Sequence, residues 1–188
     1  MPRHGDDGCY TWGSLSAEQA EVLRPYVTGQ VVTDLGSGAD LVLAEQLLQL
    51  GAARVVAVDP LADFRHRYEP PGSVDPRIEP RSVEFVDFGD EVDVAFLSWP
   101  KMYGVEGLVE AVTRSPVVAY LGKNADGVSC GPVALFRHLA GRAVFAHAPD
   151  EVNTLIVYGG AVGGPRELLA EERSAIDRRT IHRRSRGG

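Results

Sequence analysis

The sequence has few cysteines, few lysines and no long apolar run. Cys9 and Cys130 are the only cysteines among 188 residues, and they lie about 120 residues apart. This spacing excludes a disulfide framework and a cysteine-based zinc site, so we expect a reducing, cytoplasmic compartment. No apolar stretch approaches the ~20 residues of a membrane-spanning helix. Residues 1–13 (MPRHGDDGCYTWG) lack the apolar core of a signal peptide.

Positive charge is also scarce. The chain has 19 Lys and Arg residues against 26 Asp and Glu residues, and its net charge is −7. This balance argues against a protein that coats nucleic acid over its whole surface. Basic residues gather instead in residues 177–188 (DRRTIHRRSRGG). We interpret this segment either as a solvated, flexible tail or as an arm that contacts phosphates of a nucleic acid.

The remaining composition indicates one globular domain, which we place at residues 1–176. Hydrophobic residues make up 44% of the chain and charged residues 24%, close to globular averages. Apolar, β-branched runs alternate with segments of helical periodicity. The runs predict strands at residues 30–35, 54–58, 82–86, 92–98, 116–121, 142–147 and 152–158, the last of them rather exposed at Thr154. Helices between most of these strands predict a doubly wound, mostly parallel, seven-stranded α/β sheet with helices on both faces, a Rossmann-like fold.

Local signals set several boundaries within this α/β sheet. Ser16 and Gln19 have the spacing of a capping box, so a helix is predicted to follow Ser16. Asp40 is predicted to cap a second helix, which Gly51 ends. Further helices are predicted at residues 62–68, 104–113, 130–139 and 166–178. Prolines interrupt residues 60–81, which we expect to form an irregular loop, either an inert surface segment or part of a lid.

A glycine turn and two carboxylates mark the candidate site. The predicted strand at residues 30–35 leads into the turn Asp34-Leu35-Gly36-Ser37-Gly38-Ala39-Asp40. The next predicted strand, at residues 54–58, leads into Asp59, which lies 21 residues after Gly38. Glycines let a ligand approach the backbone, and an acid at this spacing can accept hydrogen bonds from ribose hydroxyls. We therefore predict a nucleoside site. The alternative is that the glycines serve only a tight turn and the acids cap helices.

The same residues disfavour a dinucleotide. The GxGxxG fingerprint requires glycine at position 41, where this chain has Leu41. Asp34 and Asp40 would flank the position of a pyrophosphate and repel it. A cationic nucleoside fits better, and S-adenosylmethionine (SAM) carries a sulfonium and an ammonium but no phosphate.

The segment VVTDLGSGADLVLAEQLLQLGAARVVAVDP resembles the first two motifs of the class I SAM-dependent methyltransferases. The resemblance implies that Asp34 lies near the methionyl ammonium, that the glycine turn lines the methionine and that Asp59 holds the ribose. It also implies that Asp87 meets the adenine amino group, with Phe88 beside the ring. One departure is Asp40, which stands in place of the third glycine. The implied cofactor-binding residues are Asp34, Gly36, Ser37, Gly38, Asp40, Asp59, Pro60, Asp87 and Phe88.

The segment Ser98-Trp99-Pro100 follows the fourth predicted strand, from which these enzymes reach their acceptor. It is similar in part to the Asp/Asn/Ser-Pro-Pro-aromatic motif of enzymes that methylate nucleic-acid base amines, although Trp99 replaces the first proline. Trp99 is interpreted either as a platform for a base or as a residue that closes the strand end over the core. Lys123 and Asn124 are further candidates for acceptor contacts.

Other chemistries have weaker support. The five histidines are scattered without paired spacing, so no metal site is expected, and Cys130 has no visible base to make it a nucleophile. The sequence therefore predicts a SAM-dependent methyltransferase with an unidentified acceptor, either a nucleic-acid base amine or a small molecule or protein. The alternatives are a non-catalytic nucleoside-binding domain and, after it, an NAD-dependent oxidoreductase.

Overall fold

The computed structural model describes residues 3–4, 10–11, 14–62, 74–89, 92–100, 107–123, 131–150 and 153–160. Several predictions lie outside these residues. They are the helix at 62–68 beyond its first residue, the helix at 166–178, the basic segment 177–188, and the candidates Asn124 and Cys130.

Seven strands form one sheet in the order β5-β4-β3-β6-β7-β9-β8. All neighbouring strands from β5 to β7 are parallel, whereas β9 is antiparallel to both β7 and β8. The prediction of a mostly parallel, seven-stranded sheet is therefore confirmed. The strands are β3 (Val31–Leu35), β4 (Arg54–Val58), β5 (Ile78–Arg81), β6 (Val94–Ser98), β7 (Val117–Lys123), β8 (Ala143–Pro149) and β9 (Asn153–Gly159).

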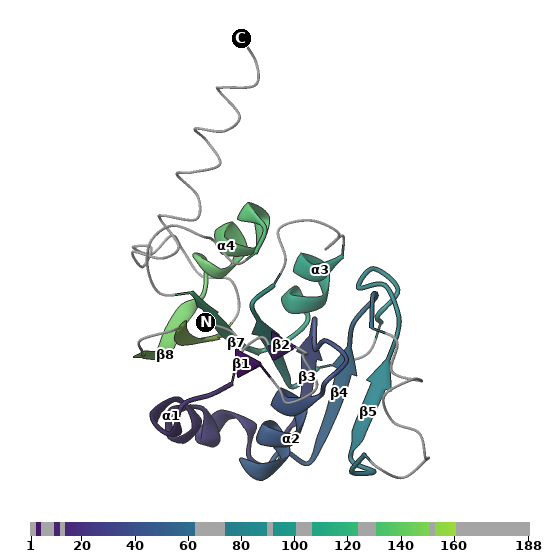
Figure 1. Cartoon of the computed structure of the whole chain (residues 1–188). Helices are drawn as coiled ribbons and strands as arrows, with labels where there is room; N and C mark the ends of the chain where they lie inside the picture. Colours follow the sequence, from purple (N-terminus) through teal and green to yellow (C-terminus); the bar gives the residue numbers. More distant parts are fainter. Residues whose placement is uncertain are drawn as a thin grey trace.

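Helices cover both faces of this sheet (Figure 1). One face packs on α1 (Ala17–Val27) and α2 (Val42–Gln49), and the other packs on α3 (Leu108–Thr113) and α4 (Val133–Leu139). Alternate residues of each central strand enter the two resulting cores, as the period of a strand buried on both sides requires. A separate two-stranded antiparallel sheet joins β1 (Arg3–His4) and β2 (Tyr10–Thr11).

The predicted start of α1 is confirmed in detail. Ser16 is the N-cap, its side chain accepts from the backbone N–H of Gln19, and the Gln19 side chain accepts from the backbone N–H of Ser16. The same Gln19 is fully buried and donates to the carbonyl of Ala148 and to the side chain of Asn153. The capping box therefore also fastens α1 to the turn between β8 and β9. Pro25 lies inside α1, which ends two residues later at Val27.

Two strand predictions are corrected by the structure. The third strand is not residues 82–86 but β5, four residues earlier, and residues 85–87 form a turn. Pro80 lies within β5, which an edge strand tolerates because one side of its backbone needs no ladder partner. The last strand, which Thr154 suggested to be rather exposed, is buried along its whole length, and Thr154 is 1% exposed. β9 pairs along its two edges with β7 and β8, and its faces are buried because its residues alternate between the two cores, with Leu155 in one and Ile156 in the other.

A buried arginine organises the edge of the sheet where the parallel strands begin. Arg142 precedes β8, and its guanidinium donates to the carbonyls of Ser115 at 2.8 Å and Val112 at 3.1 Å. These carbonyls lie at the end of α3, where a cation complements the helix dipole. Ser115 in turn accepts, through Oγ, a hydrogen bond from the backbone N–H of Ala95 at 2.9 Å.

Within the described residues, no helix combines the length and the apolar character that crossing a bilayer requires.

Candidate functional site

The candidate site lies at the edge where the parallel strands end. From β3 the chain crosses to β4 on one side and later returns to β6 on the other, so the direction of strand order reverses at β3. Ligands of open α/β sheets bind beside such a point, outside the carboxyl ends of the strands. The segments that follow β3, β4 and β6 therefore form the candidate site.

The turn after β3 is fixed against β4 and leaves open space above its glycines. The backbone N–H groups of Gly36 and Ser37 both donate to the carbonyl of Val58, at 2.7 and 3.2 Å. Gly36 has φ +86° and Gly38 has φ +68°. A Cβ added to Gly36 would have no neighbour within 4 Å, and one added to Gly38 would meet only Asp40 Oδ1 at 4.0 Å. The turn is thus a cradle whose glycines expose backbone to a ligand.

The predicted cap of α2 is wrong. The N-cap is Leu41, which has φ +52° and makes no side-chain capping bond, and its carbonyl accepts from Glu45. The Leu41 side chain is buried in the core and is 1% exposed. The left-handed backbone conformation of Leu41 destabilises the fold by about 1 kcal/mol. Asp40 is therefore not the N-cap residue of α2 and lies in the turn before it, half-buried.

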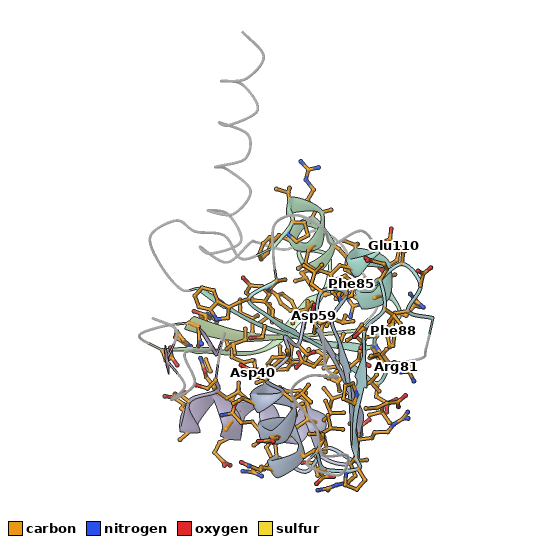
Figure 2. All side chains as sticks on the ribbon, turned by 45° about the vertical axis from the view of Figure 1, so that its right-hand side comes forward. Asp40, Asp59, Arg81, Phe85, Phe88 and Glu110 are labelled. Atoms are coloured by element: carbon orange, nitrogen blue, oxygen red, sulfur yellow. The ribbon has the colours of Figure 1, made fainter. Side chains whose placement is uncertain are left out.

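Asp59 connects the two strand ends. Its Oδ2 accepts from the backbone N–H of Gly38 at 2.9 Å, and its Oδ1 accepts from the backbone N–H of Leu61 at 2.8 Å. Each carboxylate oxygen can accept a second hydrogen bond. The Asp59 side chain is half-buried, so part of it is exposed to solvent. Figure 2 shows Asp40 and Asp59 in the middle of the molecule, apart from Arg81 and Phe88 at the β5 edge.

Asp34 is the unusual group of the site. It lies within β3, 0% exposed, and neither carboxyl oxygen has a hydrogen-bond partner among the described residues. Burial raises the pKa of Asp34 to about 8, and the negative charges of Asp40 and Asp59 add to the shift. A buried polar group without a partner destabilises a fold unless a ligand or water completes it. Asp34 therefore points to a ligand with a hydrogen-bond donor or a positive charge.

The segment after β6 closes over the other core. Ser98 is the last residue of β6 and is buried, and Pro100 is also buried. Trp99 has φ +46°, donates its backbone N–H to the carbonyl of Leu121 at 2.8 Å, and packs half-buried against the core under α3 and α4. A Cβ added to Gly131 would lie 3.2 Å from Pro100 Cγ, so the residues just before α4 contact this segment.

The interpretation of Asp87 and Phe88 rested on a strand that ends beside them, and this strand ends at Arg81. Asp87 is exposed on the turn after it. Phe88 is 2% exposed in the core, with the Arg81 guanidinium 5.8 Å from its ring centroid (Figure 2). The structure therefore removes the reason for placing these two residues at an adenine ring.

Leu61 is a site residue that the sequence analysis missed. Its side chain is 77% exposed, unusual for leucine, and its backbone N–H binds Asp59. The signal was available, because a large apolar residue follows directly on Asp59-Pro60 at the rim of the predicted site. Pro60 itself is half-buried. In the described part of the chain, no group of three or more His, Cys, Asp or Glu side chains is arranged to hold a metal ion.

Comparison with known proteins supports the fold. No protein-family model matches the sequence, and no curated protein is significantly similar to it. Solved structures do match. A Pyrococcus horikoshii protein described as a proposed RNA methyltransferase has a TM-score of 0.59 and 16% identity, over 78% of this chain and 84% of that one.

Two further matches hold cofactor or product. Magnesium protoporphyrin IX methyltransferase from Synechocystis, with bound SAM, has a TM-score of 0.54 and 10% identity, over 77% of this chain and 79% of that one. The 1,6-didemethyltoxoflavin-N1-methyltransferase of Burkholderia thailandensis, with bound S-adenosylhomocysteine, has a TM-score of 0.53 and 13% identity, over 76% of each chain. The chain therefore has the class I methyltransferase-like fold, and at these identities the likeness concerns the fold alone.

Proposed function

We propose that this chain, which has the class I methyltransferase-like fold, is a SAM-dependent methyltransferase. The observation that carries the proposal is Asp34, a fully buried carboxyl without a partner among the described residues, which lies two residues before a turn whose glycines have open space at their Cβ positions. A cationic ligand at this turn would supply the missing partner. A diphosphate would add negative charge beside Asp40 and Asp59, which favours SAM over a dinucleotide.

The residues present fit SAM at both ends of the site. Asp34 and the turn Gly36-Ser37-Gly38 would hold the methionine part, with Asp40 beside them, and Asp59 would accept hydrogen bonds from the ribose. Pro60 and Leu61 continue the same rim, and the exposed Leu61 side chain offers apolar surface to the base. Because Asp59 already positions Gly38 and Leu61 through their backbone N–H groups, the site is organised before the ligand arrives.

SAM, when bound, supplies a methyl group on a positively charged sulfur. The chain's own task is to hold an acceptor in line with that group and to exclude water. Ser98, Trp99 and Pro100 extend from the neighbouring strand end and are the residues we assign to the acceptor side. Their partial resemblance to the base-amine motif makes a nucleic-acid base amine our first acceptor class, with residues 177–188 as a phosphate-contacting arm.

Methyl incorporation from labelled SAM tests this function. Purified protein is incubated with DNA, RNA and a cell extract in parallel, with Asp59→Ala as the deficient variant and Asp75→Ala, before β5 at the opposite edge of the sheet, as the matched control. We expect label in a nucleic-acid fraction with the wild type and with Asp75→Ala, and a strong loss with Asp59→Ala. Label only in protein or small molecules would show that the acceptor is not a nucleic-acid base. No label in any fraction would contradict the methyltransferase activity.

The second candidate is a non-catalytic domain that keeps the cofactor site. The observation that favours it is Trp99, which packs against the core under α3 and α4 where the base-amine motif has a proline. This candidate predicts saturable SAM binding without methyl transfer to any fraction.

A further inference from the structure

The inference concerns the protonation state of Asp34. Its side chain is 0% exposed, and neither carboxyl oxygen has a hydrogen-bond partner among the described residues. An ionised carboxylate in such a place lacks both water and a counter-charge, and proteins respond to that cost by keeping the group neutral. Asp34 differs in this from Asp59, whose two oxygens each accept a backbone N–H.

In the part of the chain that the structure describes, the charged groups acting on Asp34 are both negative. Its register neighbours are Ala57 on β4 and Phe96 on β6. The charged groups that act on it are Asp40, from the turn before α2, and Asp59, from the end of β4, and both oppose ionisation. The buried face of α2 is apolar and consists of Leu43, Ala44, Leu47 and Leu48. With its pKa at about 8, Asp34 holds a proton at neutral pH.

We propose that Asp34 gives up this proton when the cationic amino-acid end of SAM binds, so that cofactor binding releases one proton and Asp34 selects for the positive charge of the ligand. The inference rests on the proposed function. The O–H bond of the carboxylic acid breaks, the proton passes to solvent, and the carboxylate that remains pairs with the cation. Neutral Asp34 thus spares the ligand-free protein a buried negative charge beside the half-buried Asp40 and Asp59, and the ionised form appears only with its partner.

Calorimetric titration with SAM at pH 6.5, in buffers of different ionisation enthalpy, counts the released protons. At this pH an ordinary α-amino group is already protonated, so the ligand itself neither takes up nor releases protons appreciably. We expect about one proton released per SAM by the wild type and by the control Asp75→Asn, whose carboxylate lies before β5, at the edge where the parallel strands begin. Asp34→Asn should release none, and neither should binding of 5′-methylthioadenosine to the wild type, since this nucleoside lacks the amino-acid part.

The affinity provides a second readout. If binding releases one proton, the affinity of the wild type for SAM should rise about tenfold between pH 6 and pH 7. Asp34→Asn should bind SAM more weakly, and its affinity should not depend on pH in this range. If Asp34→Asn does not fold, the proton count and the pH dependence of the wild type decide.

The outcomes separate the two proposals. Saturable SAM binding with no proton release, or with release unchanged in Asp34→Asn, overturns the proton coupling and leaves the proposed function standing. Absence of SAM binding to the wild type overturns both.

Discussion

The Asp59 carboxylate holds the Gly38 backbone N–H at 2.9 Å, across the ends of two neighbouring parallel strands. The same carboxylate holds the N–H of Leu61, so one side chain fixes both segments that flank the candidate site. Because these bonds form within the chain, the glycine turn needs little reorganisation to receive a ligand. The predictions below follow from this preorganised edge and from the groups beside it.

Gly38→Ala should weaken SAM binding at least tenfold. Gly38 has φ +68°, and the added methyl group would enter the open space that we assign to the ligand. The left-handed backbone should also lower the free energy of unfolding by about 1–2 kcal/mol. Gly29→Ala is the matched control, because Gly29 has φ +74° and open space but lies in the turn before β3. Equal affinity of Gly38→Ala and Gly29→Ala for SAM, by calorimetry, would contradict the assignment.

Asp34 should make the ligand-free protein less stable as pH rises. Its pKa of about 8 in the folded state lies above the ordinary value near 4 of the unfolded chain, so between these values the folded state binds more protons. The free energy of unfolding therefore falls from about pH 4 to about pH 8, by at most about 1.4 kcal/mol per pH unit for this one group. Urea unfolding of wild type and Asp34→Asn at pH 5 and pH 8 measures this change in the free energy of unfolding. Relative to wild type, the free energy of unfolding of Asp34→Asn should be higher at pH 8 than at pH 5. If the two proteins show the same pH dependence, Asp34 is ionised throughout this range.

Arg142→Ala should destabilise the fold without affecting the cofactor site. Loss of the guanidinium leaves the carbonyls of Val112 and Ser115 without this donor, at the edge where the parallel strands begin. We expect a loss of about 2–4 kcal/mol in urea unfolding. The exposed Arg114→Ala is the control and should stay within about 0.5 kcal/mol of wild type. A tenfold change in the SAM affinity of folded Arg142→Ala would show that the two edges are coupled.

Trp99→Ala should impair use of the acceptor without weakening SAM binding. If Trp99 serves the acceptor side, kcat/KM for methyl incorporation falls more than tenfold while the Kd for SAM stays near that of wild type, and Trp99→Phe retains more activity. Phe145→Ala, which removes a half-exposed aromatic ring from β8, controls for general loss of surface aromatics. Unchanged kcat/KM together with a lower Tm would make Trp99 a purely structural residue.

Much of the fold could be predicted because its signals are local. The capping box at Ser16 and Gln19, the β-branched runs of β3 and β4, and Gly51 with φ +100° after α2 each act within a few residues. The resulting β3–α2–β4 unit is sufficient to predict that the glycine turn and Asp59 lie at adjoining strand ends.

The wrong strand predictions concern segments whose structure depends on packing against distant parts of the chain. The run Ser82–Val86 suggested a strand, but Phe85 enters the core from a turn. Thr154 suggested an exposed strand, because nothing local shows that β9 inserts between β7 and β8. At the site, the acids were visible in the sequence. That Asp59 has backbone partners, whereas Asp34 has none among the described residues, depends on the packing of three strands and could not be predicted.

The account depends most on SAM binding between the ends of β3 and β4, and calorimetric titration of the wild type and Asp59→Ala with SAM measures this directly. We predict one saturable site in the wild type and at least tenfold weaker binding in Asp59→Ala, with NAD giving no heat of binding in either. Equal affinity of the two proteins for SAM, or binding of NAD in its place, would contradict the account.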